Sequence, residues 1–210
     1  MSAADAPTHL LVPIKRLALA KSRVAVEPAV RSALALAMAL DTVAVARAAR
    51  EVAQVWIVSS DLEVRAAMAT WDVGFIDEPT VDPDEPEPLN AALRTGLQSL
   101  ARAVPCSPTA IVPADLPALR SEHLDAVLVS CRGHDRGLVA DYSGEGTTLL
   151  WGRTASHVKP SFGQHSLARH LAQGAVMVQA ADDVRLDVDT LDDLAAARRL
   201  GVGPNTSELA

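Results

Sequence analysis

Short β-branched runs and longer helix-forming segments alternate along the chain, and this alternation constrains the fold more than any other feature of the sequence. Residues 9–14 form an apolar run that ends in a basic loop, and the alanine-rich segment 28–50 that follows has helix-forming composition. Repeated units of this kind are typical of a sheet covered by helices on both faces. The sequence therefore predicts an α/β fold with a single doubly wound, largely parallel sheet.

The same pattern predicts one domain over residues 9–204, with a disordered tail at 1–8 and a short tail at 205–210. Ser121 is expected to cap one helix. The expected strands span residues 9–14, 54–59, 73–77, 109–113, 137–141, 147–151, 175–179 and 184–188, and the expected helices span 28–50, 62–70, 89–103, 121–131, 166–173 and 191–200.

Composition excludes several classes of protein. A net charge of -7 and an aromatic content of 3% argue against nucleic-acid binding. Cys106 and Cys131 lie far apart without metal-ligand spacing, so we expect neither a zinc site nor a disulfide framework, and a cytoplasmic location. No export signal and no membrane span are expected. Oligomeric state is open; a homodimer is the commonest outcome.

A basic loop follows the first expected strand. It carries Lys15, Arg16, Lys21 and Arg23, four cations within nine residues, and it contains no glycine. Because ligands bind at the carboxyl ends of the strands in doubly wound sheets, side-chain charge at this place favours phosphate binding. The alternative is a solvated basic loop.

Two aspartates follow expected strands and indicate a metal site. Asp115 comes directly after the strand 109–113, and Asp187 lies near the end of the strand 184–188. Magnesium is usually held by one or two carboxylates together with substrate phosphates, so the pair predicts a shared Mg²⁺ site. Asp115 opening an ordinary turn is the alternative. Asp189 is interpreted in part as the N-cap of the last helix, and Asp187 is the better metal candidate.

Two glycine-bearing turns, residues 144–148 and 162–166, are followed by hydroxyl residues, and the second opens a helix. Both present backbone N–H groups and hydroxyls that suit a phosphate or a carboxylate, although two ordinary turns are the alternative. Arg169 and His170, one helical turn later, would add charge on the same side, and their role is left open.

Taken together, these motifs resemble the phosphoenolpyruvate or 2-phospho-L-lactate guanylyltransferases of deazaflavin coenzyme biosynthesis, most closely their actinobacterial branch. The similarity extends from Leu11 to Pro204 and is more specific than any single motif. It is carried in order by VPIKRLALAKSR, the acidic loop ending in PLN, PADLPAL, VADYSGEGTT, FGQHSLARH and LDVDTLDDLAAARRLGVGP.

The resemblance implies a nucleotide-diphospho-sugar-transferase-like (Rossmann-like) nucleotidyltransferase fold, GTP as donor and magnesium as the metal. It implies a triphosphate-binding loop, although Ser22 and Val24 replace the Thr and Leu that relatives often have. It gives Gln164 and His165 no role. The implied site residues are Asp115 and Asp187 for the metal, Thr147, Gly163 and Ser166 for the phospho-acid, and Lys15, Arg16, Lys21, Arg23 and Asn90 for the nucleotide, with Lys15 and Lys21 also catalytic.

The implied reaction joins GMP from GTP to phosphoenolpyruvate and releases pyrophosphate. The alternatives are the same reaction on 2-phospho-L-lactate or 3-phosphoglycerate, and transfer to a molybdenum-cofactor precursor or a sugar phosphate. A nucleotide-binding regulator with the same fold is the alternative outside enzymes, and the presence of both Asp115 and Asp187 argues against it.

Overall fold

The computed structural model describes residues 6–19, 27–79 and 85–209, and every structural statement below concerns these residues. The strands are β1 (Thr8–Pro13), β2 (Val52–Val58), β3 (Gly74–Ile76), β4 (Thr109–Ile111), β5 (Arg136–Ala140), β6 (Thr147–Gly152) and β7 (Val176–Met177). The helices are α1 (Pro28–Ala48), α2 (Leu62–Ala67), α3 (Pro88–Ala103), α4 (Ser121–Cys131), α5 (Ser166–Ala172), α6 (Asp182–Arg185), α7 (Leu191–Leu200) and α8 (Pro204–Glu208), with 3-10 turns η2 (Leu17–Leu19) and η3 (Ala155–His157).

The seven described strands form one sheet in the order β3-β2-β1-β4-β6-β5-β7. Strand β6 is inserted between β4 and β5 and pairs antiparallel with both. The remaining pairs are parallel. The predicted largely parallel sheet is therefore confirmed, with β6 reversed.

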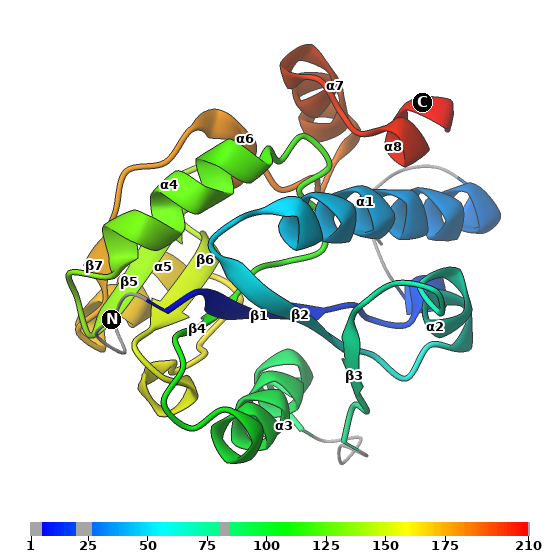
Figure 1. The fold of residues 1–210 in the computed structure, drawn as a ribbon. Coiled ribbons are helices and arrows are strands. Elements are labelled where there is room, and N and C mark those ends of the chain that lie inside the picture. The colour runs from blue at the N-terminus through cyan, green and yellow to red at the C-terminus, as the bar shows by residue number, and fades with distance from the viewer. Residues whose placement is uncertain (1–5, 20–26, 80–84, 210) are drawn as a thin grey trace.

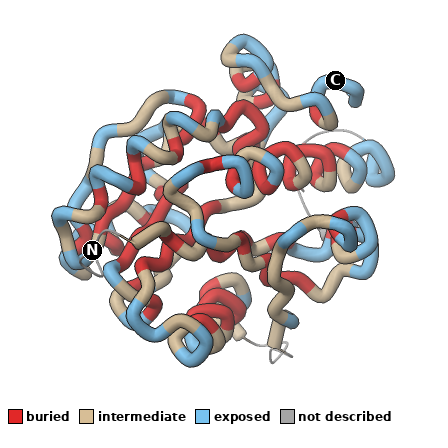
Figure 2. The backbone as a smooth tube through the Cα atoms, viewed as in Figure 1, coloured by how far each residue is buried: buried red, intermediate tan, exposed pale blue. Residues whose placement is uncertain are grey.

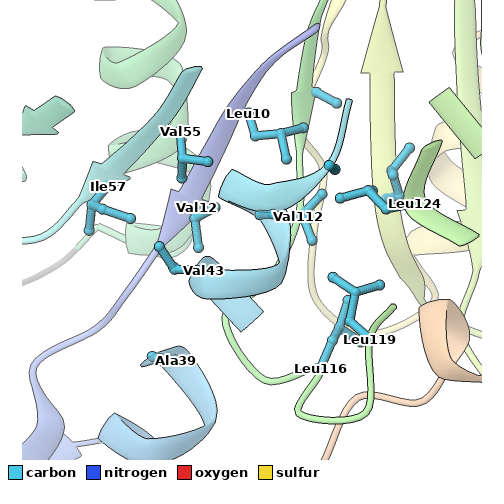
Figure 3. Close-up of a cluster of buried hydrophobic side chains, with 14 of the residues drawn as sticks. Leu10, Val12, Ala39, Val43, Val55, Ile57, Val112, Leu116, Leu119 and Leu124 are labelled. Atoms are coloured by element: carbon cyan, nitrogen blue, oxygen red, sulfur yellow. The ribbon is translucent and has the colours of Figure 1, made fainter. Parts of the chain in front are cut away.

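Helices cover both faces of the sheet, as the sequence predicts (Figure 1). Successive strand side chains point to opposite faces: Leu10 and Val12 of β1 pack in the cluster that includes α1 and α4, whereas Leu11 packs on the other face with α3. Figure 3 shows the first cluster, in which Val43 of α1 lies beside Val12. These two apolar layers hold the sheet between its helices.

Helix α1 is long and apolar enough to cross a membrane by length and composition alone. Half of its most apolar window is buried inside the protein, and Asp41 within it accepts hydrogen bonds from Asn205 and Thr206 of α8. Figure 2 shows buried residues along the middle of this helix and exposed residues at its N-terminal end. These contacts are those of a core helix.

The strand expected at 184–188 is wrong. Residues 182–185 form the short helix α6, and the segment after it is extended without joining the sheet. Asp182 and Asp183 at the start of α6 suit a helix N-terminus, where the backbone N–H groups favour negative charge. The apolar residues Leu186 and Val188 that suggested a strand are instead buried in a small cluster with α1 and α7.

The ends of several elements differ from the prediction by small shifts. The N-cap of α4 is Arg120, and Ser121 is its first helical residue, because the backbone N–H of Arg120 donates to the buried Asp183. Residues 1–5 of the expected disordered tail lie outside the described residues, and Thr8 already belongs to β1. Residues 205–208, expected as a tail, belong to α8.

Candidate functional site

The predicted site residues gather at one edge of the sheet. The parallel strands β1 and β4 end there, and the reversed strand β6 begins there. Ile111 pairs with Leu150 at the end of β4, so residues 112–115 leave the sheet at the edge where β6 begins with Thr147. The start of β6 and the turn that carries Asp115 therefore lie at the same edge of the sheet, because β6 runs antiparallel to β4.

Helix α1 holds the turn that carries Asp115. The hydroxyl of the fully buried Thr42 accepts a hydrogen bond from Leu116 N at 3.1 Å. The same oxygen lies 2.8 Å from Met38 O and 3.3 Å from Ala114 O, the two acceptors of its proton. Both neighbours of Asp115 are therefore fixed to α1, while Asp115 itself is half-buried.

Asp187 lies on the extended segment that passes this turn. Val188 N donates to Asp115 O at 3.0 Å, so the two segments are joined directly. Leu186 and Val188 are buried, and Asp187 between them is half-buried. The predicted strand is wrong, but the segment that carries Asp187 still contacts the turn that carries Asp115, as the predicted metal site requires.

Asp189 is not the N-cap of the last helix. Thr190 caps α7, and Asp193 completes a capping box by accepting from Thr190 N at 2.8 Å. Asp189 N donates to Asp193 as well, at 3.1 Å. The prediction for Asp189 was wrong by one residue, because the Thr190–Asp193 spacing forms the box.

Asp115 and Asp187 are two carboxylates, a donor set that suits an ion such as magnesium, which takes its other ligands from water and substrate. Among the described residues, no group of three or more His, Cys, Asp and Glu is placed to hold a metal ion. Two carboxylate-bearing segments joined at Asp115 and Val188 match an ion that completes its shell with water and substrate phosphates. The residues present therefore fit Mg²⁺.

The described part of the basic loop is anchored at Leu17. Its N–H donates to Asp61 Oδ2 at 2.9 Å, and its carbonyl accepts from Ser32 of α1 at 3.2 Å. Burial raises the pKa of Asp61, but backbone N–H donors, including that of Leu17, and the charge of Arg16 outweigh it and leave this pKa below its ordinary value. Lys15 and Arg16 are exposed. The predicted contacts of Lys21 and Arg23 lie outside the described residues.

Thr147 and Ser166 meet as the two glycine-bearing turns come together. Both are buried, with 8% and 2% of their surfaces exposed. Ser166 Oγ donates to Thr147 Oγ1 at 3.4 Å, and His170 Nδ1 lies 3.0 Å from the same oxygen. A backbone hydrogen bond from Leu167 N to Glu145 O ties the turns together. The hydroxyls of Thr147 and Ser166, which the sequence analysis predicted from two separate motifs, are therefore in direct contact.

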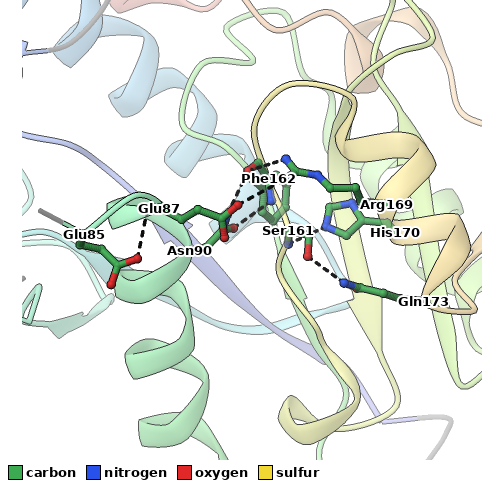
Figure 4. Close-up of polar contacts among 8 residues, drawn as sticks. All are labelled: Glu85, Glu87, Asn90, Ser161, Phe162, Arg169, His170 and Gln173. Carbon is green, nitrogen blue, oxygen red and sulfur yellow. Dashed lines mark hydrogen bonds and ion pairs between the residues drawn. The ribbon is translucent and has the colours of Figure 1, made fainter.

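Gly163 follows Phe162, whose backbone is held by the polar contacts drawn in Figure 4. The buried side chain of Asn90 accepts from Phe162 N at 2.8 Å and donates to Phe162 O at 3.0 Å. Arg169 also donates to Phe162 O, and it pairs with Glu87. Gly163 has φ of +117°, which an L side chain rarely adopts. Asn90 thus fixes the peptide before Gly163, and its predicted nucleotide contact stays a prediction.

Sequence reasoning missed Thr42 and Asp61. It also expected His170 to add charge here, which is wrong, because burial lowers the pKa of His170 to about 4. Thr42 lies 74 residues from Leu116 in the sequence. An isolated threonine within an alanine-rich helix carries no local signal of such a contact. Asp61 had a weaker signal, because it stands one residue before α2, where an N-cap is expected, and it does cap that helix.

The family model described as "Guanylyl transferase CofC like" matches residues 8–208. Two relatives share the name phosphoenolpyruvate guanylyltransferase. The Streptomyces coelicolor protein is 44% identical over 206 residues, covering 96% of this chain and 94% of its own. The Streptomyces scabiei protein is 45% identical over 206 residues, with the same coverage of 96% and 94%.

Solved structures share the fold at low sequence identity. A Desulfovibrio desulfuricans protein assigned as a nucleotide-diphospho-sugar transferase superposes with a TM-score of 0.67 at 15% identity, covering 92% of this chain and 87% of that one. The manganese complex of Rv0371c from Mycobacterium tuberculosis superposes with a TM-score of 0.56 at 21% identity, covering 93% and 98%. The predicted nucleotide-diphospho-sugar-transferase-like fold is confirmed.

Proposed function

Because the chain belongs to the CofC-like guanylyl transferase family, we propose that it transfers GMP from GTP to phosphoenolpyruvate. The observation that carries this proposal is the match over residues 8–208 to a guanylyl transferase family whose relatives bear that enzyme's name. The joining of the Asp115 and Asp187 segments at the sheet edge where Thr147 begins β6 supports it. We propose a cytoplasmic step of deazaflavin coenzyme biosynthesis as its place.

The bond changes of the reaction need no nucleophile from the protein. An oxygen of the acceptor phosphate bonds to the α-phosphorus of GTP, and the bond from that phosphorus to the bridging oxygen of the β-phosphate breaks. The products are enolpyruvyl-diphospho-guanosine and pyrophosphate. Because the acceptor phosphate is already ionised near neutral pH, no general base is needed. The protein's task is to bring two anions together and to offset their repulsion.

Asp115 and Asp187 are proposed to hold magnesium, as the donor set allows. The ion, when bound, supplies positive charge that offsets the charge on the phosphates during transfer. The manganese bound by a protein of the same fold supports a divalent metal here. Thr42 holds the backbone on both sides of Asp115, so the turn that carries this carboxylate is fixed before substrate arrives.

The two substrates are proposed to bind on either side of the Asp115 turn. On the β1 side, Lys15, Arg16, Lys21 and Arg23 meet the triphosphate of GTP. On the β6 side, Thr147, Ser166 and the backbone at Gly163 meet the phospho-acid. The anchoring of the two loops supports this division. Leu17 in the donor loop is held by Ser32 of α1, whereas Phe162 near the acceptor site is held by Asn90 of α3.

The test is pyrophosphate release from GTP with phosphoenolpyruvate, 2-phospho-L-lactate and 3-phosphoglycerate offered in turn, with sugar phosphates and a molybdenum-cofactor precursor as further acceptors. Phosphoenolpyruvate is expected to give the highest kcat/KM. A higher value with another acceptor would reassign the substrate, and GTP binding without turnover on any acceptor would indicate a regulator.

Asp115→Asn and Asp187→Asn test the metal site. Each removes a negative oxygen from the proposed Mg²⁺ shell at nearly constant size, so we expect kcat to fall by at least about a hundredfold, the scale on which one strong electrostatic contact to a transition state acts. The melting temperature should stay within a few degrees. Asp72→Asn is the matched control, because Asp72 is exposed and lies in the turn before β3. Near-normal turnover by either variant would remove that residue from the site.

A further inference from the structure

His170 is buried completely at the centre of the proposed acceptor site, and its two ring nitrogens have different partners. Ser161 N lies 2.9 Å from Nε2 (Figure 4). A backbone N–H can only donate, so Nε2 must be the nitrogen without a proton. The proton of the neutral ring is therefore on Nδ1.

This tautomer determines what Thr147 can do. Nδ1–H donates to Thr147 Oγ1 across 3.0 Å, and Ser166 Oγ donates to the same oxygen across 3.4 Å. Both lone pairs of the Thr147 oxygen are then used. Over the described ranges 6–19, 27–79 and 85–209, no acceptor is found for the proton of Thr147 itself. The Thr147 hydroxyl is thus left as a hydrogen-bond donor.

We infer that His170 is a positioning residue that turns the Thr147 hydroxyl into a fixed donor for an anionic oxygen of the acceptor. The inference rests on the proposed function for the identity of that acceptor. An anionic group accepts but cannot donate, so a hydroxyl whose oxygen is already occupied is selective for it. His170 acts through Thr147 and does not itself need to touch the substrate.

The surroundings of His170 keep this arrangement in place. Burial, and secondarily the charge of Arg169, lowers the pKa of His170 to about 4, so the ring is neutral at physiological pH. The ring of Phe162 packs edge-on against it with centroids 5.0 Å apart. Gln173 donates to Ser161 Oγ at 2.8 Å and steadies the residue that occupies Nε2.

Two substitutions separate the contacts of the ring. His170→Asn places an amide N–H where Nδ1 lies and retains a donor for Thr147. His170→Gln places its terminal amide nearer Nε2 and retains a partner for Ser161 instead. We expect the KM for phosphoenolpyruvate to rise about tenfold in His170→Gln, on the scale of one hydrogen bond to a charged group, and much less in His170→Asn. The KM for GTP should be unchanged in both.

A double-mutant cycle shows whether His170 works through Thr147. In a Thr147→Val background, His170→Gln is expected to add less than about a twofold change to the KM for phosphoenolpyruvate, because the donor it orients is already gone. Equal tenfold effects of His170→Gln with and without Thr147 would overturn the inference. An unchanged KM for phosphoenolpyruvate in the single variant His170→Gln, with normal turnover, would also overturn the inference.

A readout without turnover keeps the inference separate from the proposed function. Nitrogen-15 NMR of the parent protein labelled at histidine identifies which nitrogen of His170 carries the proton. A protonated Nε2 would overturn the inference even if the enzyme makes its product. Failure of the parent to release pyrophosphate with phosphoenolpyruvate would overturn the proposed substrate and leave the measured tautomer as it is.

Discussion

At the scale of single residues, the candidate site depends on side chains that never need to touch a substrate. Thr42 and Asn90 are both buried, and each forms hydrogen bonds to backbone groups of the loops that carry the site. Thr42 reaches the residues flanking Asp115, and Asn90 reaches both backbone polar atoms of Phe162. The geometry of the site is thus set by backbone anchoring as much as by its charged side chains.

Thr42→Val removes the anchoring hydroxyl at nearly constant volume. Leu116 N loses its buried acceptor, which costs roughly 1–3 kcal/mol. Since the Asp115 turn is loosened as well, the magnesium concentration that gives half-maximal activity should rise. Urea unfolding and magnesium titrations of pyrophosphate release measure the two effects.

Thr206→Val is the matched control for this substitution. Thr206 is equally buried, but within the described part of the chain its hydroxyl has no hydrogen-bond partner, so its loss should not destabilise the protein. Equal behaviour of the two valine variants would mean that Thr42 does not anchor the turn.

At the scale of elements, the sequence predicted well what depends on local pattern. The apolar run 9–14 predicted a strand from its own composition, and in the structure Leu10 and Val12 pack on one face of the sheet and Leu11 on the other. Residues 184–188 misled the prediction because a strand also needs a neighbouring edge to pair with, and that is not encoded in its own five residues. The contact from Asn90 to Phe162 spans 72 residues and was equally invisible.

The loop after β1 is the element that tests the donor site. Lys15→Met deletes an exposed charge while keeping much of the side-chain stem. If the loop meets the triphosphate, the KM for GTP should rise roughly tenfold or more, as for a lost charge-assisted hydrogen bond, and pyrophosphate release should slow. Lys21→Met, outside the described residues, is expected to behave alike.

Arg102→Met serves as the comparison for the loop variants, because Arg102 is an exposed cation at the end of α3. Parent-like steady-state constants for both lysine variants at physiological salt would show that the loop is merely solvated. A solvated loop is the outcome expected for most clusters of surface charge.

At the scale of the whole molecule, the end of the described chain is closed onto its first long helix. Asp41 of α1 is 2% exposed and accepts from Asn205 N at 3.1 Å, from Asn205 Nδ2 at 2.8 Å and from Thr206 N at 2.8 Å. This carboxylate satisfies N–H groups at the start of α8 that no residue of the helix itself accepts. Helix α8 is therefore part of the folded unit.

Asp41→Asn tests this closure. It replaces an acceptor oxygen by an NH₂ group that cannot accept, so the free energy of unfolding should fall by roughly 1–3 kcal/mol. For a chain of this size, each kcal/mol lowers the melting temperature by about 2–4 °C. The values of kcat and KM should be preserved. A melting temperature equal to that of the parent would show that α8 contributes little to stability.

The reversal of β6 has a consequence for how such an enzyme diversifies. Strands β1, β2 and β3 are parallel, and each is joined to the next by a crossover that contains a helix. Strands β5 and β6 are joined by the short hairpin loop 141–146, which opens directly onto Thr147. Changes in hairpin length alter one side of the site alone. We expect relatives within this family that use different acceptors to differ in the length and sequence of that hairpin.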